Sequence, residues 1–318
     1  MRERAIDRRA YPAAYINMRI LVIGATGYLG SHIARHLTET GHQVSGLSRN
    51  SDRDAALEAS GVKALRGDLA DVGSIIDMMR GHDATIYAAQ LMLQAEFESI
   101  AALLKGMESR SHSFIFTSGT GLLSQRTDGA WSEDSFAEDD PFIPSKYIGY
   151  RLVTETMIRQ SGTSGRVRTM VVRPPMIWGN GGCGHLRMMY ADAGRSGEVA
   201  YLGAGLNLYS NVHVDDLAEV YRLALEKGTA GALYHAVAGE LNNRTLAEAV
   251  ARDVGKKARG VDFIEGIRRW GKFETLIGMA TCSRSRSPRT RRELGWTPRH
   301  LDLLTDVGHP AYRALAGL

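Results

Sequence analysis

A glycine-rich turn between an apolar strand and an amphipathic helix constrains the fold of this chain more than any other feature. Residues 19–23 (RILVI) form a short, mostly apolar run that leads directly into Gly24. After the turn, apolar residues recur at helical spacing, at Leu29, Ile33, Ala34 and Leu37. The order of strand, glycine turn and helix is typical of the first unit of a parallel α/β sheet.

Strand and helix patterns then alternate along the chain. Further strands are expected at 42–47, 62–66, 84–88, 113–117 and 169–172, and a helix from about 148 to 160 precedes the last of them. Because right-handed crossovers place helices on both faces of such a sheet, the sequence predicts the α/β class with a doubly wound parallel sheet, the Rossmann fold.

The pattern changes in the second half of the chain. From 178 to 210 the sequence is rich in glycine, and we expect loops there that line a substrate cleft. A strand at 211–214 and helices at 215–225 and 245–254 are expected after it, followed by a poorly patterned stretch to the end. These features predict a smaller C-terminal lobe beside the sheet.

The glycine turn, GATGYLG at 24–30, also predicts a ligand. A turn in this position aims backbone N–H groups and the positive end of the helix at a pyrophosphate. Gly24 would permit the tight turn, Gly27 the close approach of the phosphates, and Gly30 the packing of helix on strand. We therefore expect a dinucleotide on this turn, with further contacts from Thr26, Tyr28 and Leu29.

The end of the second strand bears on which dinucleotide is bound. NAD sites carry an acidic residue about 20 residues after the glycines, whereas the 2′-phosphate of NADP needs a cation. Here the strand ends in Ser48-Arg49-Asn50, and Arg53 lies close behind. An arginine fork suits a phosphate. The sequence thus predicts NADP, with NAD as the alternative and an ordinary surface arginine as the other interpretation of Arg49.

Composition and charge exclude several classes of partner. The net charge of +4 is mild for 318 residues and the arginines are spread along the chain, so no nucleic acid is expected. The basic run at 283–292 (SRSRSPRTRR) is interpreted as a solvated loop. No apolar run approaches the roughly 18 residues that cross a bilayer, and residues 1–17 lack the apolar stretch of a secretory signal, so we expect a cytoplasmic protein without a membrane partner. Cys183 and Cys282 fit neither a metal site nor a disulfide framework and are expected to be thiols.

These patterns together predict a domain organisation. Residues 1–17 are expected to be a disordered leader. The dinucleotide-binding domain is expected at 18–178 with 209–238, and the substrate-binding lobe at 179–208 with 239–318.

The chain resembles the extended short-chain dehydrogenases/reductases, also called the NAD-dependent epimerase/dehydratase family, in a series of motifs and in their order along the sequence. The resemblance covers nearly everything from Met18 to Pro298. Its motifs are the glycine turn, GDL at 67–69, AA at 88–89, FTS at 116–118, RPP at 173–175, WG at 178–179, VHVDDLA at 212–218 and ELGWTP at 293–298.

The resemblance implies roles for residues along the bound cofactor. Asp68 and Leu69 would contact the adenine, and Ala88 and Ala89 would run beneath the cofactor. Pro174 to Met176 would border the nicotinamide.

The resemblance also implies a catalytic tyrosine, with a lysine four residues later on the same helix and a serine or threonine past the fifth strand. In such an arrangement the tyrosine is the acid/base and the cation stabilises its phenolate. Here Tyr147 takes the tyrosine position, but Arg151 replaces the lysine. Arg151 would still hold the ribose hydroxyls and the phenolate, although it cannot relay a proton. Lys146 is expected on a different face of the helix, where it does not easily substitute.

The hydroxyl position departs from the family as well. The register places it at Gly119, and either neighbour, Ser118 or Thr120, would serve instead. His213 and the pair Asp215-Asp216 are interpreted structurally, with the aspartates capping the helix that begins there. His185 falls in the expected substrate loop, and one histidine is not a metal site.

The preferred hypothesis is an NADP-dependent oxidoreductase that transfers a hydride between the nicotinamide and the carbonyl or alcohol of a small organic substrate. One alternative is an NAD-dependent sugar-nucleotide epimerase or dehydratase. Another is a non-catalytic dinucleotide-binding regulator, which the altered catalytic positions favour. A homodimer is a further expectation, because Ile100, Leu103, Leu104 and Met107 suit a helix bundle between subunits, although burial in the core explains them equally well.

Overall fold

The glycine turn lies between a strand and a helix, as expected, in the computed structural model, which describes residues 17–165 and 167–318. Strand β1 (Arg19–Ile23) leads into the turn, and helix α1 (Tyr28–Glu39) begins one residue after Gly27. The buried residues of α1 are Gly30, Ile33, Ala34 and Leu37. They share one face of the helix because they recur at intervals of three and four residues.

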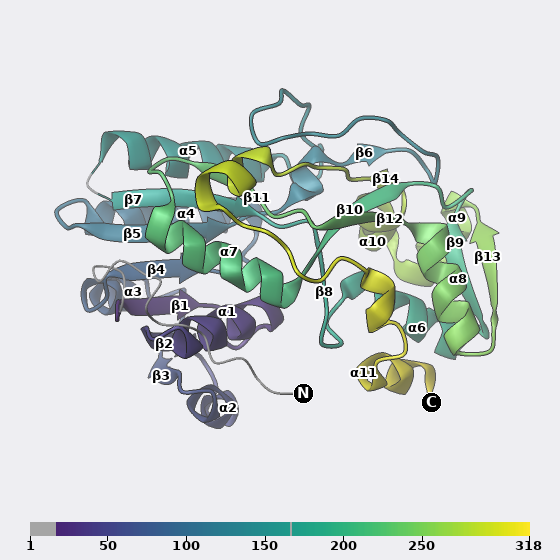
Figure 1. Cartoon of the computed structure of the whole chain (residues 1–318), viewed down its shortest axis with the longest axis horizontal. Coiled ribbons are helices and arrows are strands. Elements are labelled where there is room, and N and C mark those ends of the chain that lie inside the picture. Colours follow the sequence, from purple (N-terminus) through teal and green to yellow (C-terminus); the bar gives the residue numbers. More distant parts are fainter. Residues whose placement is uncertain (1–16, 166) are drawn as a thin grey trace. The chain divides into compact units, whose positions relative to one another are not determined.

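A parallel sheet forms the centre of the first part of the chain. Within the described residues it has seven strands in the order β11-β7-β5-β4-β1-β2-β3, and Figure 1 shows the strands from β7 to β3 stacked in this order. Their bounds are β2 (Gln43–Ser48), β3 (Lys63–Arg66), β4 (Ala84–Tyr87), β5 (His112–Thr117), β7 (Val167–Arg173) and β11 (Leu233–His235). The pairs from β7 through to β3 are all parallel. The doubly wound Rossmann fold is therefore confirmed.

The order of the strands reverses between β1 and β4, because β2 and β3 lie on one side of β1 and β4 and β5 on the other. In open α/β sheets such a switch point, at the carboxyl ends of the strands, is where ligands bind. The glycine turn after β1 lies at this point of the sheet.

Helices cover the sheet on both faces. Helices α3 (Val72–Arg80), α4 (Leu93–Met107) and α5 (Tyr150–Ser164) contribute to one apolar core with β1, β4 and β5. On α4, Ile100, Leu103, Leu104 and Met107 are all buried in this core, so packing within the chain accounts for them. Helices α1 and α7 (Val214–Lys227) are joined by His36 and Glu219, whose Nε2 and Oε2 atoms lie 2.8 Å apart. The short helix α2 (Asp54–Ala59) connects β2 to β3.

By internal contacts the chain divides into two compact units. The first comprises the chain up to Ser118, Tyr150–Val172 and Ala218–Leu233, and the second comprises Gly119–Gly149, Arg173–Leu217 and Tyr234–Leu318. The cofactor turn thus lies in the first unit, and the segment that carries Tyr147 lies in the second.

The prediction of loops from 178 to 210 is wrong. Regular elements occupy most of this stretch: β8 (Met176–Trp178), α6 (Gly184–Ser196), β9 (Glu198–Leu202) and β10 (Leu208–His213). Helix α6 buries Leu186, Met189, Tyr190 and Ala193, which have helical spacing. The prediction missed this helix because glycines at 179–184 and at 197 surround it and are typical of loops. Strand β9 forms only by pairing with β13 (Lys257–Val261), so its partner is remote in the sequence.

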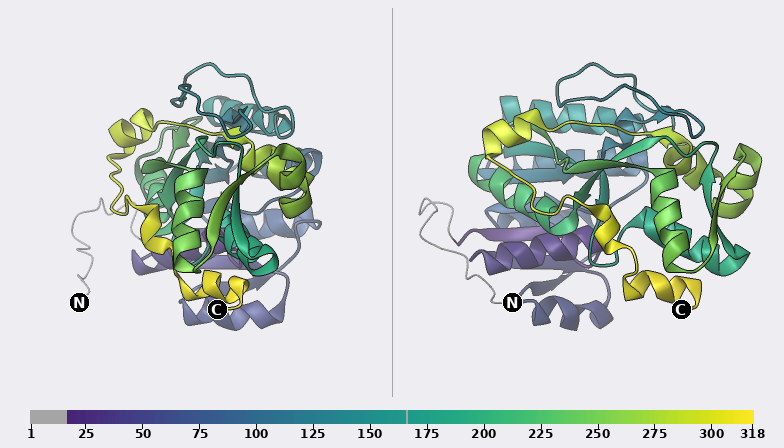
Figure 2. Two further views of the ribbon diagram at one scale, coloured as in Figure 1. Left: turned by 90° about the vertical axis from the view of Figure 1, so that its right-hand side faces the viewer. Right: turned by 45° about the vertical axis from the view of Figure 1, so that its right-hand side comes forward.

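The rest of the second unit surrounds these elements. Helix α8 (Asn243–Asp253) packs on the β9–β13 pair, as Figure 2 shows, and β12 (Gly239–Asn242) joins β10 and β8 in a three-stranded sheet. Further short elements are β6 (Gln125–Arg126), α9 (Phe263–Trp270), α10 (Lys272–Glu274), a π-helical turn at Thr275–Met279, β14 (Thr281–Cys282) and α11 (Pro310–Arg313).

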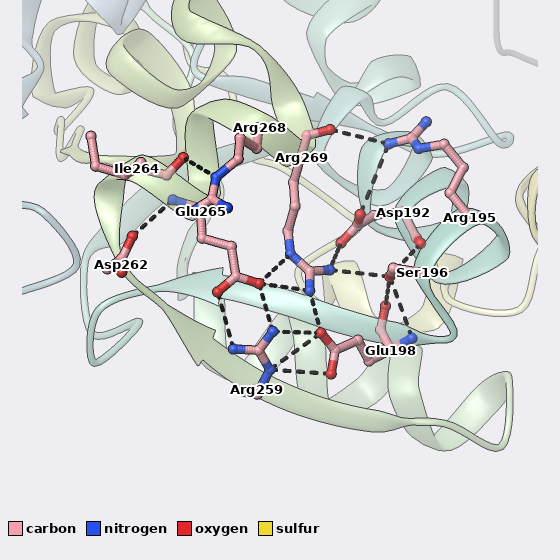
Figure 3. Close-up of polar contacts among 10 residues, drawn as sticks. All are labelled: Asp192, Arg195, Ser196, Glu198, Arg259, Asp262, Ile264, Glu265, Arg268 and Arg269. Atoms are coloured by element: carbon pink, nitrogen blue, oxygen red, sulfur yellow. Dashed lines mark hydrogen bonds and ion pairs between the residues drawn. The ribbon is translucent and has the colours of Figure 1, made fainter.

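A network of ion pairs ties α6, α9, β9 and β13 together (Figure 3). Arg269 donates from Nη1 to Asp192 at 3.2 Å and from Nε to Glu265 at 2.9 Å, and it also binds Glu198. Arg259 bridges Glu198 and Glu265 from the other side. The side chain of Arg269 is 13% exposed and that of Arg259 is 45% exposed, so Arg269 is the buried centre of the network.

The basic run at 283–292 is not the solvated loop that composition suggests. Its hydroxyl residues Ser283, Ser285, Ser287 and Thr290 are buried. Between them, Arg284, Arg286 and Arg289 pair with Glu240, Asp140 and Asp139. Small hydroxyl side chains fit against the interior while the alternate arginines reach surface carboxylates, and composition alone does not show such alternation.

Candidate functional site

The cofactor turn has the backbone geometry that its glycines suggest. Gly24 adopts a φ of +93°, and the Gly27 amide donates to the Gly24 carbonyl at 2.9 Å. A Cβ on Gly24 would lie 2.6 Å from the Ala88 carbonyl oxygen, and one on Gly30 would lie 2.1 Å from the Gly24 oxygen. A side chain at either position would therefore displace backbone, so the close packing of helix on strand depends on glycine.

A cavity of about 600 Å³ opens beside this turn in the first unit. It brings together predicted residues from the ends of four strands: Gly24, Thr26, Arg49, Asp68, Leu69 and Ala89. Tyr28 and Leu29 begin α1, and the Ala88 backbone packs against Gly24. The Asp68 carboxylate accepts from the Ala70 amide at 2.9 Å, which orients it at the cavity wall.

Arg49 follows the last residue of β2 and is exposed at the wall of this cavity. Its guanidinium makes no ion pair or hydrogen bond within the part of the chain that the structure describes. Arg53 instead donates from Nη1 to the Thr26 carbonyl at 2.9 Å, so it braces the glycine turn. A glycine cradle, a helix N-terminus and an unengaged cation at one cavity fit a dinucleotide that carries phosphate groups.

The expectation, implied by the resemblance, that Tyr147 and Arg151 share one helix is wrong. Helix α5 begins at Tyr150, and Tyr147 precedes it in a turn, with 37% of the residue exposed. Without the helical register, Lys146 is not directed away from the tyrosine. Its Nζ atom lies over the Tyr147 ring, 5.1 Å from the centroid. Lys146 is thus a cation beside the phenol that the sequence interpretation set aside.

Arg151 is engaged elsewhere in the first unit. Its Nε and Nη2 atoms donate to the two carboxylate oxygens of Glu96 at 3.0 and 2.8 Å. Glu96 is fully buried on α4, and burial raises the pKa of its carboxyl while Arg151 opposes that rise. The expected contacts of Arg151 with ribose and phenolate would have to compete with this ion pair, which the sequence interpretation did not foresee.

The two candidate hydroxyls, Ser118 and Thr120, are both buried, and neither oxygen has a hydrogen-bond partner among the described residues. Their backbones are fixed, because the Ser118 amide donates to Val172 and the Thr120 amide to the Pro174 carbonyl. Met176, the other residue expected near the nicotinamide, begins β8 and is buried.

A second cavity, of about 640 Å³, lies within the second unit beside Tyr147. Its wall includes Arg126, Phe136, Phe142 and Leu276 as well as Lys146. Sequence reasoning did not name Arg126, Phe136, Phe142 or Leu276, and the segment 119–149, which carries the first three, has no helical or strand periodicity. The pairing of β6 with β14 joins Arg126 to Thr281, a residue remote in the sequence.

His213 and Asp216, near the start of α7, make contacts within the protein, as the structural interpretation expected. The side chain that caps the helix differs from the predicted one. The His213 side chain, not an aspartate, accepts from the Asp215 amide, at 3.2 Å. The Asp216 carboxylate accepts from the amides of Arg299 and His300 and so fixes the C-terminal segment.

His185 lies in the first turn of α6 and not in a loop, and its burial lowers its pKa to about 4. Cys183 and Cys282 are both buried, free thiols, as predicted. Across residues 17–165 and 167–318 no cluster of side chains has the makeup of a metal site, and no helix has the length and apolar character to span a bilayer.

The comparisons with known proteins agree with this fold. The chain belongs to the NAD dependent epimerase/dehydratase family, whose model matches residues 20–238. It is therefore an enzyme of the extended short-chain dehydrogenase/reductase group, and a nicotinamide dinucleotide is its cofactor class.

Sequence similarity to known proteins covers much of the chain. An uncharacterized protein of Schizosaccharomyces pombe is 32% identical, covering 93% of this chain and 100% of its own length. The 2-alkyl-3-oxoalkanoate reductase of Stenotrophomonas maltophilia is 28% identical, covering 68% of this chain and 67% of its own length. Among solved structures, DesIV, a dTDP-glucose 4,6-dehydratase from Streptomyces venezuelae, superposes with a TM-score of 0.75 at 21% identity, over 94% of this chain and 98% of that one. This last likeness shows the common fold.

Proposed function

We propose that the protein is an NADP-dependent oxidoreductase that acts on the carbonyl or alcohol of a small organic substrate. The observation that carries the cofactor half of this proposal is the unengaged guanidinium of Arg49 at the wall of the glycine-turn cavity. A 2′-phosphate would satisfy that cation, whereas a ribose hydroxyl would leave it without a counter-charge.

The substrate half rests on Tyr147. The nicotinamide, when bound, supplies or accepts the hydride. Tyr147 gives the proton to the substrate oxygen in reduction and takes it back in oxidation. Its phenol has no hydrogen-bond partner among the described residues, so it is available to a substrate. Lys146 lies over the tyrosine ring and supplies a cation beside it, while Arg151 is paired with Glu96. The hydroxyl of Ser118 or Thr120 orients the reacting oxygen.

A relative's name supports the carbonyl substrate, because the Stenotrophomonas maltophilia protein is described as a reductase of a 3-oxo compound. The second candidate is an NAD-dependent epimerase or dehydratase. Its support is a dTDP-glucose 4,6-dehydratase of Streptomyces niveus that is 25% identical over 89% of this chain.

Cofactor titration tests the first half of the proposal. NADPH and NADH are titrated into wild type, Arg49→Ala and a control, Arg80→Ala, which removes an exposed arginine of the same unit that does not line the cavity. We expect wild type to prefer NADPH, and Arg49→Ala to lose about 10- to 100-fold in NADPH affinity with little change for NADH. Tighter binding of NADH by wild type would favour the epimerase or dehydratase.

Turnover tests the second half. Tyr147→Phe should lower kcat by about 10²- to 10⁴-fold while NADPH affinity stays unchanged. An unchanged kcat in this variant would remove Tyr147 from the reaction and leave only the cofactor assignment.

A further inference from the structure

The cavity beside Tyr147 combines an apolar wall with a cation in a fixed position. Phe136, Phe142, Ile143 and Leu276 supply apolar surface, and Phe136 packs edge-on against Phe142 with ring centroids 6.3 Å apart. Arg126 and Lys146 bring positive charge to the same wall. A ligand that fills this cavity therefore meets both aliphatic or aromatic surface and a cation.

Two contacts orient the guanidinium of Arg126. Its Nε atom donates to Asp128 at 2.8 Å, and its Cζ atom lies 4.3 Å from the centroid of the Phe263 ring. The two terminal nitrogens, Nη1 and Nη2, make no hydrogen bond within residues 17–165 and 167–318. One edge of the guanidinium is thus occupied, while the terminal edge is open to a planar anion with two oxygens.

The balance of charge selects the kind of anion. The cavity wall carries two cations, Arg126 and Lys146, and one carboxylate, Asp134, which accepts from the Gln125 amide at 2.7 Å. Asp128 lies on the far edge of Arg126 and adds a further negative charge nearby. A singly charged carboxylate suits this field better than a phosphate monoester, which carries nearly two charges at neutral pH.

We propose that this cavity takes oxo and hydroxy carboxylic acids with an apolar chain, and that the open edge of Arg126 binds the carboxylate. The apolar chain packs on Phe136, Phe142 and Leu276, and the carbonyl or hydroxyl oxygen faces Tyr147. In the reducing direction the carbonyl carbon receives the hydride from NADPH and its oxygen receives the proton from Tyr147, which gives the hydroxy acid and NADP⁺. The identity of the reacting oxygen rests on the proposed function, but binding of the carboxylate does not.

Equilibrium binding to the NADP⁺-loaded protein tests the anion site without turnover. The probes are octanoate, octanamide and octyl phosphate, which share an apolar chain and differ in head group. We expect wild type to bind octanoate about 10-fold or more tightly than octanamide, and more tightly than octyl phosphate. Arg126→Gln should abolish the preference for octanoate and leave octanamide binding unchanged.

Two further variants, Asp128→Asn and Arg126→Lys, separate recognition of the carboxylate from effects on folding. Asp128→Asn breaks the same ion pair but keeps the guanidinium, so it should keep the preference for octanoate. Arg126→Lys should keep part of that preference, because it retains the charge without the planar fork. Equal binding of acid and amide by wild type would overturn the proposal, as would tighter binding of octyl phosphate. Loss of octanamide binding in Arg126→Gln would also overturn it, because the arginine would then shape the cavity and not recognise an anion.

The reaction is tested separately, with NADPH and a 3-oxo acid or its methyl ester. A binding preference for octanoate without reduction of either compound would refute the proposed function and keep the anion site. Reduction of acid and ester at equal kcat/KM would keep the proposed function and refute the carboxylate assignment.

Discussion

Arg151 and Glu96 form an ion pair around a fully buried carboxylate. The planar guanidinium of Arg151 matches both oxygens of the buried carboxylate, whereas a lysine at this position could make only a point contact. The pair joins the first turn of α5 to α4. A residue that the resemblance places at the cofactor here forms part of the packing between two helices.

Removing Arg151 alone should destabilise the protein strongly. Arg151→Met leaves the fully buried Glu96 without its cation, and such a loss costs about 3–5 kcal/mol. The double variant Glu96→Gln/Arg151→Met should recover most of that loss, because no charge then remains buried. Urea unfolding of the single and double variants measures both effects. If Arg151→Met unfolds at the same urea concentration as wild type, the ion pair does not contribute to folding.

At the residue scale, sequence reasoning succeeded where the signal is local. Gly24 and Arg49 follow two successive strands and line one cavity, and Gly30 packs against the Gly24 backbone, so the spacing of neighbouring elements was enough to find them. Lys146 was misjudged because its direction depends on where α5 begins, and helix starts are poorly defined by periodicity. Arg126 was missed because the pairing of β6 with β14 and the contact with Phe263 both depend on tertiary structure.

At the scale of single elements, the N-termini of α1 and α3 offer a matched comparison. Gly30 and Gly73 both lie in the first turn of a helix, but a Cβ on Gly30 would meet the Gly24 oxygen at 2.1 Å, whereas one on Gly73 has only an ordinary contact at 3.7 Å. Gly30→Ala should therefore abolish NADPH binding by displacing the turn. Gly73→Ala should bind normally and gain up to about 1 kcal/mol of stability, because alanine favours helix. Fluorescence titration and urea unfolding check the two effects, and normal NADPH binding by Gly30→Ala would contradict the close packing of helix and turn.

The ion-pair network of Figure 3 should depend unequally on Arg269 and Arg259. Arg269→Met leaves Asp192, whose side chain is 3% exposed, without its closest cation, and we expect a loss of about 3 kcal/mol or more. Arg259→Met should lose much less, because that side chain is 45% exposed and water can replace its contacts. Urea unfolding of the two variants ranks them. Equal losses would mean that burial does not control the strength of this network.

Elements were predictable in proportion to how local their patterns are. The strands β1, β4, β5 and β7 of the central sheet were placed to within a few residues, because mostly apolar runs mark strands buried on both faces. The elements β8 and β9 were missed because they are short and acquire their partners from β10 and β13. The alternation of buried hydroxyls and paired arginines at 283–290 was also missed, because its partners come from distant segments.

At the scale of the whole molecule, buried histidines should control how stability depends on pH. Burial lowers the pKa to about 4 for His42, His112 and His185 and to about 3 for His235, and these histidines are spread over both units. In the unfolded chain they would titrate near 6.5. His235 illustrates the cause: its Nδ1 lies 3.0 Å from the Arg286 carbonyl, which it can reach only as a donor, and Arg173 lies near its Nε2, so a second proton would meet a positive charge.

Since the folded pKa values are lowered, the unfolded chain binds more protons than the native one between pH 6.5 and about 4. The contribution of these histidines to the free energy of unfolding should therefore be fully present above pH 6.5. It should be lost as the pH drops, by up to about 1.4 kcal/mol per pH unit for each such histidine. The raised pKa values of Glu96 and Asp192 act in the opposite direction, because as the pH falls the native state protonates these carboxyls before the unfolded chain does. Urea unfolding at pH 7, 6 and 5 should show a steep loss in the free energy of unfolding, at pH values above the range where most carboxylates titrate.

His235→Asn, whose amide can still donate to the Arg286 carbonyl, should reduce the slope of this pH dependence by one histidine's share. His112→Asn should do the same in the other unit, with additive slopes in the double variant. A slope that neither substitution changes would mean that groups other than these buried rings bind the protons that unfold the protein.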